Sequence, residues 1–232
     1  MSCTLTTIVF FSNGIGARTS VLAFLKSRRL LVSVIQTCLF TLRRPCNEFE
    51  APPTWYKRHY ILSLMQRHNF DAFVETGTYL GLTSKIVALR NPTVMVDSIE
   101  LDDDLFLRAT RTLSIFYPRV KVWHGDSKKI LKTILELRRG KRVLFWLDGH
   151  QSHGITSGGD LDSPLSDELA MIFDYLADEF QGCFILVDDV HEINNHPDYP
   201  NLDYILNLAR LKGFDTKFHA NMLMIYPNSI RP

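Results

Sequence analysis

Acidic residues recur at one kind of position along this chain, directly after a short apolar segment. They are Glu75, Glu100, Asp126, Asp148 and the pair Asp188-Asp189. Each apolar segment is predicted to be a β-strand, and in open α/β sheets ligands bind outside the carboxyl ends of the strands. Carboxylates gathered at one such edge would favour a ligand with positive charge, and they could also hold a metal ion.

A glycine-containing loop follows the first of these acids. It reads ETGTYLG from Glu75 to Gly81, and Tyr79 takes the place of the second glycine in the dinucleotide pattern G-x-G-x-x-G. Gly77 and Gly81 still permit a tight turn and the close passage of a ligand. The loop therefore favours a phosphate-free cationic ligand such as S-adenosylmethionine, which carries a sulfonium and an ammonium group.

Two further acids are placed to bind the nucleoside of such a ligand. Glu100 ends the next predicted strand, about 20 residues after the loop, where an acid accepts hydrogen bonds from ribose hydroxyls. Asp126 ends the strand after that and is placed to meet an adenine edge, with Ser127 beside it. A role for Asp126 as a helix cap is compatible with this position.

Five motifs in this order resemble those of class I S-adenosylmethionine-dependent methyltransferases. They are VETGTYLG, SIELD, HGDS, FWLDGH and LVDDVH, within residues 55–226. They are especially similar to those of small bacterial-type methyltransferase-like proteins with an ETGTYxG loop and a WLDGH motif. The resemblance implies a set of cofactor-binding residues: Glu75, Gly77, Tyr79, Gly81, Glu100, Leu101, Asp126, Ser127 and Asp148. The sequence departs from the pattern at Leu82, where relatives carry an acid.

Asp148, Asp188 and Asp189 resemble the metal ligands of metal-dependent O-methyltransferases, including the catechol and macrolide-sugar types. Magnesium prefers hard oxygen ligands, and three converging carboxylates with no paired lysine would repel one another unless a cation neutralised them. The resemblance implies that Mg²⁺ binds the acceptor hydroxyl and lowers its pKa. His150 is predicted to act with Asp148 as the catalytic pair, because a histidine titrates near neutral pH. Two other histidines are alternative bases: His153 and His191.

The elements that must position these residues alternate between strand and helix. Strands are predicted at residues 73–75, 94–99, 120–123, 143–147 and 183–187, and helices at 55–68, 79–89, 102–116, 127–138, 167–180 and 202–211. This alternation predicts an α/β, Rossmann-like, seven-stranded and mostly parallel sheet with helices on both faces. Residues 216–220 and 222–226 are expected to close it as an antiparallel strand pair. The Gly-rich loop at 149–160 is predicted to be a lid or a substrate contact.

The first 54 residues are predicted to form a helical extension, with the Rossmann-like domain at 55–232. The apolar segment 30–42 is too short for a membrane span and is flanked by arginines. It is interpreted as a helix packed on the domain, as a basic helix that brings residues 19–44 into peripheral membrane contact, or as a cleaved signal or anchor.

The composition is that of a globular protein without strong charge bias, with 46% hydrophobic residues, 22% charged residues and a net charge of +1. It lacks the basic excess typical of nucleic-acid binding. The four scattered cysteines argue against a zinc site or a disulfide scaffold, and they favour a reducing, cytoplasmic compartment. The expected partners are a small-molecule acceptor and, in a homodimer, a second copy.

Three functions are compatible with these patterns. The favoured hypothesis is metal-assisted O-methylation of a small hydroxylated acceptor, either a sugar or a natural product. The second is a metal-dependent glycosyltransferase in which Asp102, Asp103 and Asp104 bind a nucleotide sugar, although these acids more naturally open a helix. The third is a binding module that keeps the fold without turnover.

Overall fold

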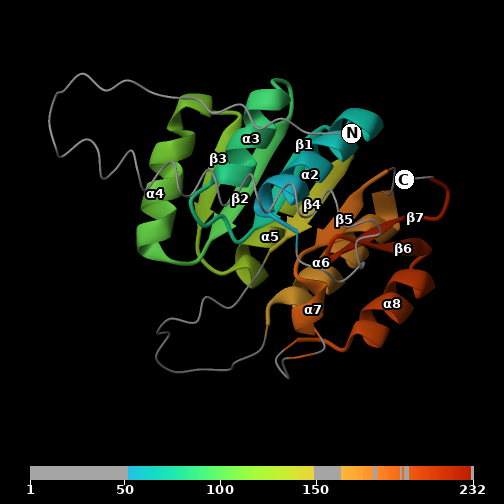
Figure 1. Cartoon of the computed structure of the whole chain (residues 1–232). Helices are drawn as coiled ribbons and strands as arrows, with labels where there is room; N and C mark the ends of the chain where they lie inside the picture. The colour runs from blue at the N-terminus through green and yellow to red at the C-terminus, as the bar shows by residue number, and fades with distance from the viewer. Residues whose placement is uncertain (1–51, 149–162, 180–181, 194, 196–198, 231–232) are drawn as a thin grey trace, which may run out of the picture. The chain divides into compact units, whose positions relative to one another are not determined.

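A computed structural model describes residues 52–148, 163–179, 182–193, 195 and 199–230 (Figure 1). The predicted helical extension and the segment 19–44 lie outside the described residues. So do His150, His153 and the loop that contains them. Of the four cysteines only Cys183 is described, and it is buried and unpaired.

Seven strands form one sheet in the order β3-β2-β1-β4-β5-β7-β6. They are β1 (Ala72–Thr76), β2 (Met95–Glu100), β3 (Val120–His124), β4 (Val143–Leu147), β5 (Phe184–Val187), β6 (Phe214–His219) and β7 (Met222–Pro227). The first five strands pair in parallel, whereas β7 pairs antiparallel with both β5 and β6. The predicted seven-stranded, mostly parallel sheet with a closing antiparallel pair is confirmed.

Helices cover both faces of this sheet (Figure 1). They are α2 (Thr54–His68), α3 (Leu82–Arg90), α4 (Asp103–Leu113), α5 (Ser127–Leu137), α6 (Leu165–Glu179), α7 (Val190–Ile193) and α8 (Leu202–Leu211), with a 3₁₀ turn at Ser114–Phe116. Apolar residues of α2, α3 and α4 share one core with the sheet, and those of α5, α6 and α8 share the other. Among the described helices, none is both long and apolar enough to cross a membrane.

The central strand β4 shows why the sheet is buried on both sides. Its five residues, VLFWL, are all buried. Leu144 and Trp146 pack in the core beneath α2 and α3, whereas Phe145 and Leu147 pack in the opposite core. Because successive strand side chains point to opposite faces, a strand without polar alternation requires cover on both faces.

The largest difference between predicted and observed helix starts is at α3. Helix α3 begins three residues later than expected, because Tyr79 and Gly81 adopt positive φ angles of 51° and 70°. A side chain at Gly81 would also place its Cβ 3.0 Å from Leu113, so the loop needs glycine there. Helix α5 begins at Ser127 as predicted, and Asp126 caps it by accepting a hydrogen bond from the Lys128 N–H, which is the cap role considered for this acid.

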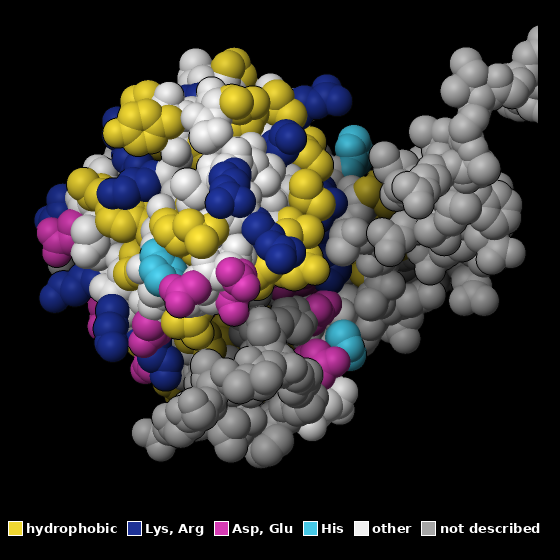
Figure 2. Space-filling view, turned by 90° about the vertical axis from the view of Figure 1, so that its left-hand side faces the viewer, with side chains coloured by type: hydrophobic (Ala, Val, Ile, Leu, Met, Phe, Trp, Pro, Cys, Tyr) yellow, Lys and Arg dark blue, Asp and Glu magenta, His cyan; other side chains and the backbone are white. Residues whose placement is uncertain are grey.

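The surface that carries α4 mixes charge types. Figure 2 shows basic, acidic and apolar side chains interspersed over the described part of this face. One polar contact of α4 joins Asp103, in its first turn, to His124 at the end of β3, with 2.9 Å between Oδ1 and Nε2. Asp102 caps the same helix by accepting a hydrogen bond from the Leu105 N–H. The structure thus gives Asp102 and Asp103 the helix-opening roles that the sequence favoured.

Candidate active site

The predicted acids follow one another along the carboxyl edge of the sheet. From β3 across β2, β1 and β4 to β5, the strand ends carry Asp126, Glu100, Glu75, Asp148 and Asp188. Chain order reverses between the neighbouring strands β1 and β4, and ligands of open α/β sheets bind at such a switch point. The structure therefore brings these acids together on one edge, where a single ligand can reach several of them.

Glu75 lies beneath the glycine loop and is only 2% exposed. Its Oε2 accepts hydrogen bonds from the hydroxyls of Ser84 and Ser98, both at 2.6 Å. Burial raises the pKa of Glu75 to about 7, although both serine hydroxyls oppose the shift. A nearby cationic ligand would favour the charged form of this carboxyl group.

Glu100 holds the glycine loop in place at the end of β2. Its Oε2 accepts a hydrogen bond from the Tyr79 N–H at 2.7 Å, and its Oε1 accepts one from the Asp102 N–H at 3.0 Å. Each carboxylate oxygen has a second acceptor position, which a ribose hydroxyl could use. The neighbouring side chains of Tyr79 and Leu101 are 63% and 62% exposed, so neither is a core residue.

The departure noted at Leu82 lies at the start of α3. Leu82, the first residue of the helix, is exposed, and the first turn carries no acid. The only acid of the loop is thus the buried Glu75, as the sequence indicated.

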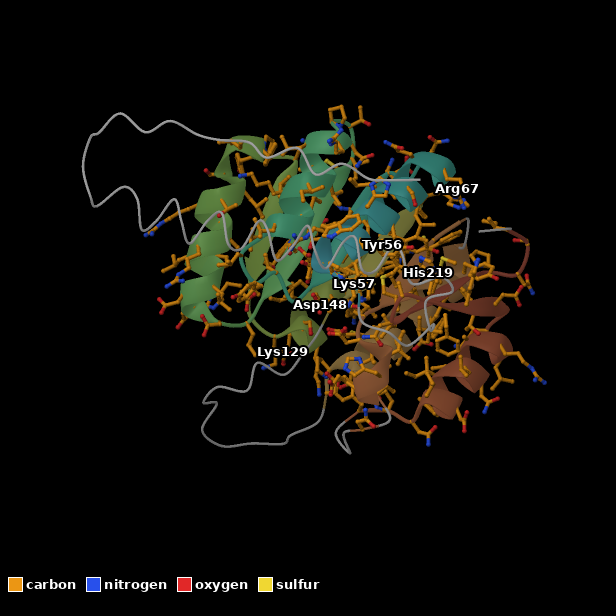
Figure 3. All side chains as sticks on the ribbon, in the orientation of Figure 1. Tyr56, Lys57, Arg67, Lys129, Asp148 and His219 are labelled. Carbon is orange, nitrogen blue, oxygen red and sulfur yellow. The ribbon has the colours of Figure 1, made fainter. Side chains whose placement is uncertain are left out.

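The acid pair after β5 has a partner that sequence reasoning missed. One carboxylate oxygen from each of Asp148, Asp188 and Asp189 lies within 4.8 Å of the others. The ammonium of Lys57, on α2, donates to Oδ1 of Asp188 at 2.5 Å and to Oδ1 of Asp189 at 2.7 Å. Figure 3 shows Lys57 and Asp148 near each other where α2 passes the end of β4. The prediction that no lysine pairs with these acids is therefore wrong, because α2 lies against this edge.

A single ammonium neutralises only one of the three carboxylates. Burial, together with the charges of Asp148 and Asp189, raises the pKa of Asp188 to about 7 even though Lys57 opposes the shift. Conversely, the two aspartates hold the pKa of Lys57 above its ordinary value, against its burial. The cluster therefore retains the excess negative charge that a divalent cation would balance.

Asn221 fixes the loop that carries this acid pair. It is fully buried, has a φ of 60° and lies in the turn between β6 and β7. Its Nδ2 donates to Oδ1 of Asp189 at 2.9 Å, and its Oδ1 accepts from the His191 N–H at 3.0 Å. A backbone N–H can only donate, so this contact fixes the orientation of the amide.

His191 is held by the same amide. Its Nδ1 lies 2.6 Å from Nδ2 of Asn221 and must therefore accept, which leaves the proton of the neutral ring on Nε2. That nitrogen faces Oε1 of Glu192 at 2.9 Å. Both ring nitrogens are thus engaged, so the geometry does not favour His191 as the general base.

Glu168 is a second residue that sequence reasoning missed. It lies in the first turn of α6, is fully buried and accepts a hydrogen bond from the Thr76 hydroxyl at 3.3 Å. Burial raises its pKa to about 7, opposed by the hydroxyls of Ser127 and Thr76 and assisted by the charge of Asp126. Glu168 therefore lies close to Thr76 and Asp126, at the predicted nucleoside site. It was missed because it lies in a helix and not at the end of a strand.

The strand order and the closing hairpin are those of the class I S-adenosylmethionine-dependent methyltransferase fold. No protein-family model matches the sequence, and neither does any curated protein. Solved structures do match. A Staphylococcus aureus protein described as a caffeoyl-CoA O-methyltransferase aligns with a TM-score of 0.55 and 13% identity over 91% of this chain and 99% of its own.

Two further structures share this fold. The methyltransferase PaMTH1 of Podospora anserina, solved with S-adenosylhomocysteine, gives a TM-score of 0.52 and 14% identity over 95% of this chain and 98% of its own. The O-methyltransferase TomG of Streptomyces achromogenes is involved in tomaymycin synthesis and was solved with S-adenosylmethionine. It gives a TM-score of 0.50 and 15% identity over 74% of this chain and 78% of its own. At these identities the likeness establishes the fold.

Proposed function

We propose that this chain is an S-adenosylmethionine-dependent O-methyltransferase that acts on a small hydroxylated acceptor, such as a sugar or another natural product, with the help of a divalent cation. The observation that carries the proposal is the row of acids along the carboxyl edge of a class I methyltransferase sheet. Neighbours of the same fold include an O-methyltransferase solved with this cofactor and a methyltransferase solved with its demethylated product.

The residues at this edge suit the parts of the cofactor in their spatial order. Asp126 would receive the adenine edge, Glu100 the ribose hydroxyls, and Glu75 the positive charge of the methionine end. Gly77 and Gly81, with φ angles of 84° and 70°, give the loop a backbone that lets a ligand approach closely. The cofactor supplies an electrophilic methyl group, so the task of the protein is to position the acceptor oxygen in line with it.

The acid cluster suits a divalent cation. Asp148, Asp188 and Asp189 would hold Mg²⁺, which when bound supplies the Lewis acidity that lowers the pKa of an acceptor hydroxyl. The hydrogen bonds that Lys57 and Asn221 donate to Asp188 and Asp189 fall on Oδ1 atoms. Lys57 and Asn221 therefore orient the two carboxylates as the outer partners of a metal site commonly do. The general base predicted at His150 lies outside the described residues and stays a prediction.

Glu100 provides the test of cofactor binding. We expect the parent protein to bind S-adenosylhomocysteine in titration calorimetry, and Glu100→Gln to weaken binding roughly 10-fold or more, because a charged acceptor of hydroxyl hydrogen bonds is lost. Glu136→Gln, a matched change on the exposed face of α5, should leave the dissociation constant unchanged. If the parent protein binds neither this ligand nor S-adenosylmethionine, the proposed function is wrong.

Asp148 provides the test of the metal. Manganese can be followed by electron paramagnetic resonance, and we expect Asp148→Asn to weaken Mn²⁺ binding at least roughly 10-fold through the loss of a ligand charge. Asp104→Asn, an exposed acid of α4, is the control and should have no effect. The reverse outcome would favour the glycosyltransferase hypothesis, which assigns the metal to Asp102–Asp104.

A further inference from the structure

The cofactor that we propose carries two opposite charges at its methionine end, and the acids described above account for only one of them. Glu75 and Asp148 can balance the ammonium and the sulfonium. The α-carboxylate needs a cation, because beside these two acids alone it would be repelled. Lys57 cannot easily serve, since its ammonium already pairs with Asp188 and Asp189.

Arg58, the next residue of α2, is a half-buried arginine with few partners among the described residues. Its Nε approaches the Thr83 hydroxyl at 3.4 Å, in the first turn of α3. Among the described residues, no hydrogen-bond or ion-pair partner meets either terminal nitrogen of its guanidinium. A guanidinium taken partly out of water normally recovers hydrogen bonds from a carboxylate or a phosphate, often through two parallel N–H donors.

The charge of Arg58 acts on the two acids that flank the switch point. Its pKa is lowered by burial, while Glu75 and Asp148 oppose that shift. At Glu75, Oε2 already accepts hydrogen bonds from two serine hydroxyls. The guanidinium is therefore close enough to the ends of β1 and β4 to interact with both charges, and its terminal N–H groups have no partner within the described part of the chain.

The sheet order shows which end of the cofactor reaches this point. Asp126, Glu100 and Glu75 end the adjacent strands β3, β2 and β1, and neighbouring strands lie about 4.8 Å apart. An adenosine placed over the ends of β3 and β2 would thus direct its methionine end toward β1 and β4. The acids at the ends of β1 and β4, Glu75 and Asp148, are the two whose charges interact with Arg58.

We infer that Arg58 binds the α-carboxylate of the cofactor's methionine moiety through its terminal N–H groups. The inference rests on the proposed function and adds to it a binding residue outside the five strand-end motifs. It gives the consecutive residues Lys57 and Arg58 separate tasks: the first orients the acid cluster and the second holds the cofactor. Helix α2 thereby becomes part of the active site.

The test compares two ligands that differ only in the carboxylate. They are S-adenosylhomocysteine and its decarboxylated analogue, S-adenosyl-3-thiopropylamine. In titration calorimetry on the full chain, Arg58→Gln should weaken S-adenosylhomocysteine roughly 10- to 100-fold, the range expected for charge-assisted hydrogen bonds. The same variant should bind the decarboxylated analogue as the parent protein does, which also shows that the site is intact.

Arg67→Gln is the matched control, since Arg67 is exposed at the other end of α2. It should bind both ligands like the parent protein. Equal weakening of both ligands by Arg58→Gln, or no weakening of either, would overturn the inference while leaving the proposed function in place. Failure of the parent protein to bind S-adenosylhomocysteine at all would instead remove the proposed function, and this inference with it.

Discussion

Replacing Lys57 by methionine should lower the free energy of unfolding by about 3–5 kcal/mol at pH 8, the usual cost of removing one partner from a buried ion pair. The side chains of Lys57 and Asp188 are only 8% and 7% exposed, and that of Asp189 is 23% exposed. Methionine keeps the length of the side chain but removes the charge. The variant would therefore leave two aspartates beside each other without their cation. Urea unfolding followed by circular dichroism, in the presence of EDTA, measures the change.

A double-mutant cycle separates this electrostatic effect from lost packing. If the loss arises from uncompensated carboxylate charge, Lys57→Met combined with Asp188→Asn should be more stable than the sum of the single changes predicts. Lys132→Met, on the exposed face of α5, should stay within about 0.5 kcal/mol of the parent protein. Strictly additive effects in the cycle would show that Lys57 acts on stability through its aliphatic stem alone.

The sequence was sufficient to predict the sheet, because the sheet is specified by local patterns. The segment VLFWL, at residues 143–147, is apolar throughout, and this predicted a strand covered on both faces. Residues 202–211 combine helical spacing with a glycine stop and match α8 in full. The start of α3 differs from the prediction because Tyr79 and Gly81 adopt positive φ angles, which residue types alone indicate only weakly.

The acids could be predicted for the same reason, since each lies at or just past the carboxyl end of a strand. The cationic partner of the acid pair could not be predicted from the sequence. Lys57 meets Asp188 across 131 positions of sequence, and a lysine within an amphipathic helix is most often a solvated residue. Asn221 similarly gave no signal, because a turn asparagine with positive φ is common. Contacts between distant segments depend on how α2 and the closing hairpin pack, and no local pattern encodes that.

Glu168, a buried acid outside every motif, should make the folding stability of the protein depend on pH. Its folded-state pKa of about 7 lies above its ordinary value of 4.5. Between these two pH values the folded state binds a proton that the unfolded state has released, so stability falls as the pH rises through this window. Above pH 7 both states are ionised and the penalty is complete. A shift of this size corresponds to about 3 kcal/mol.

Glu168→Gln removes the ionisation but keeps the shape. The difference in unfolding free energy between variant and parent should therefore shift by about 2.5 kcal/mol in the variant's favour between pH 5 and pH 8. The comparison across pH is the informative one, because Oε1 of Glu168 has no hydrogen-bond partner among the described residues, so an amide there carries its own cost at every pH. Glu136→Gln, exposed on α5, should show no such trend. A difference that stays constant from pH 5 to pH 8 would mean that Glu168 titrates at the same pH in the folded and unfolded states.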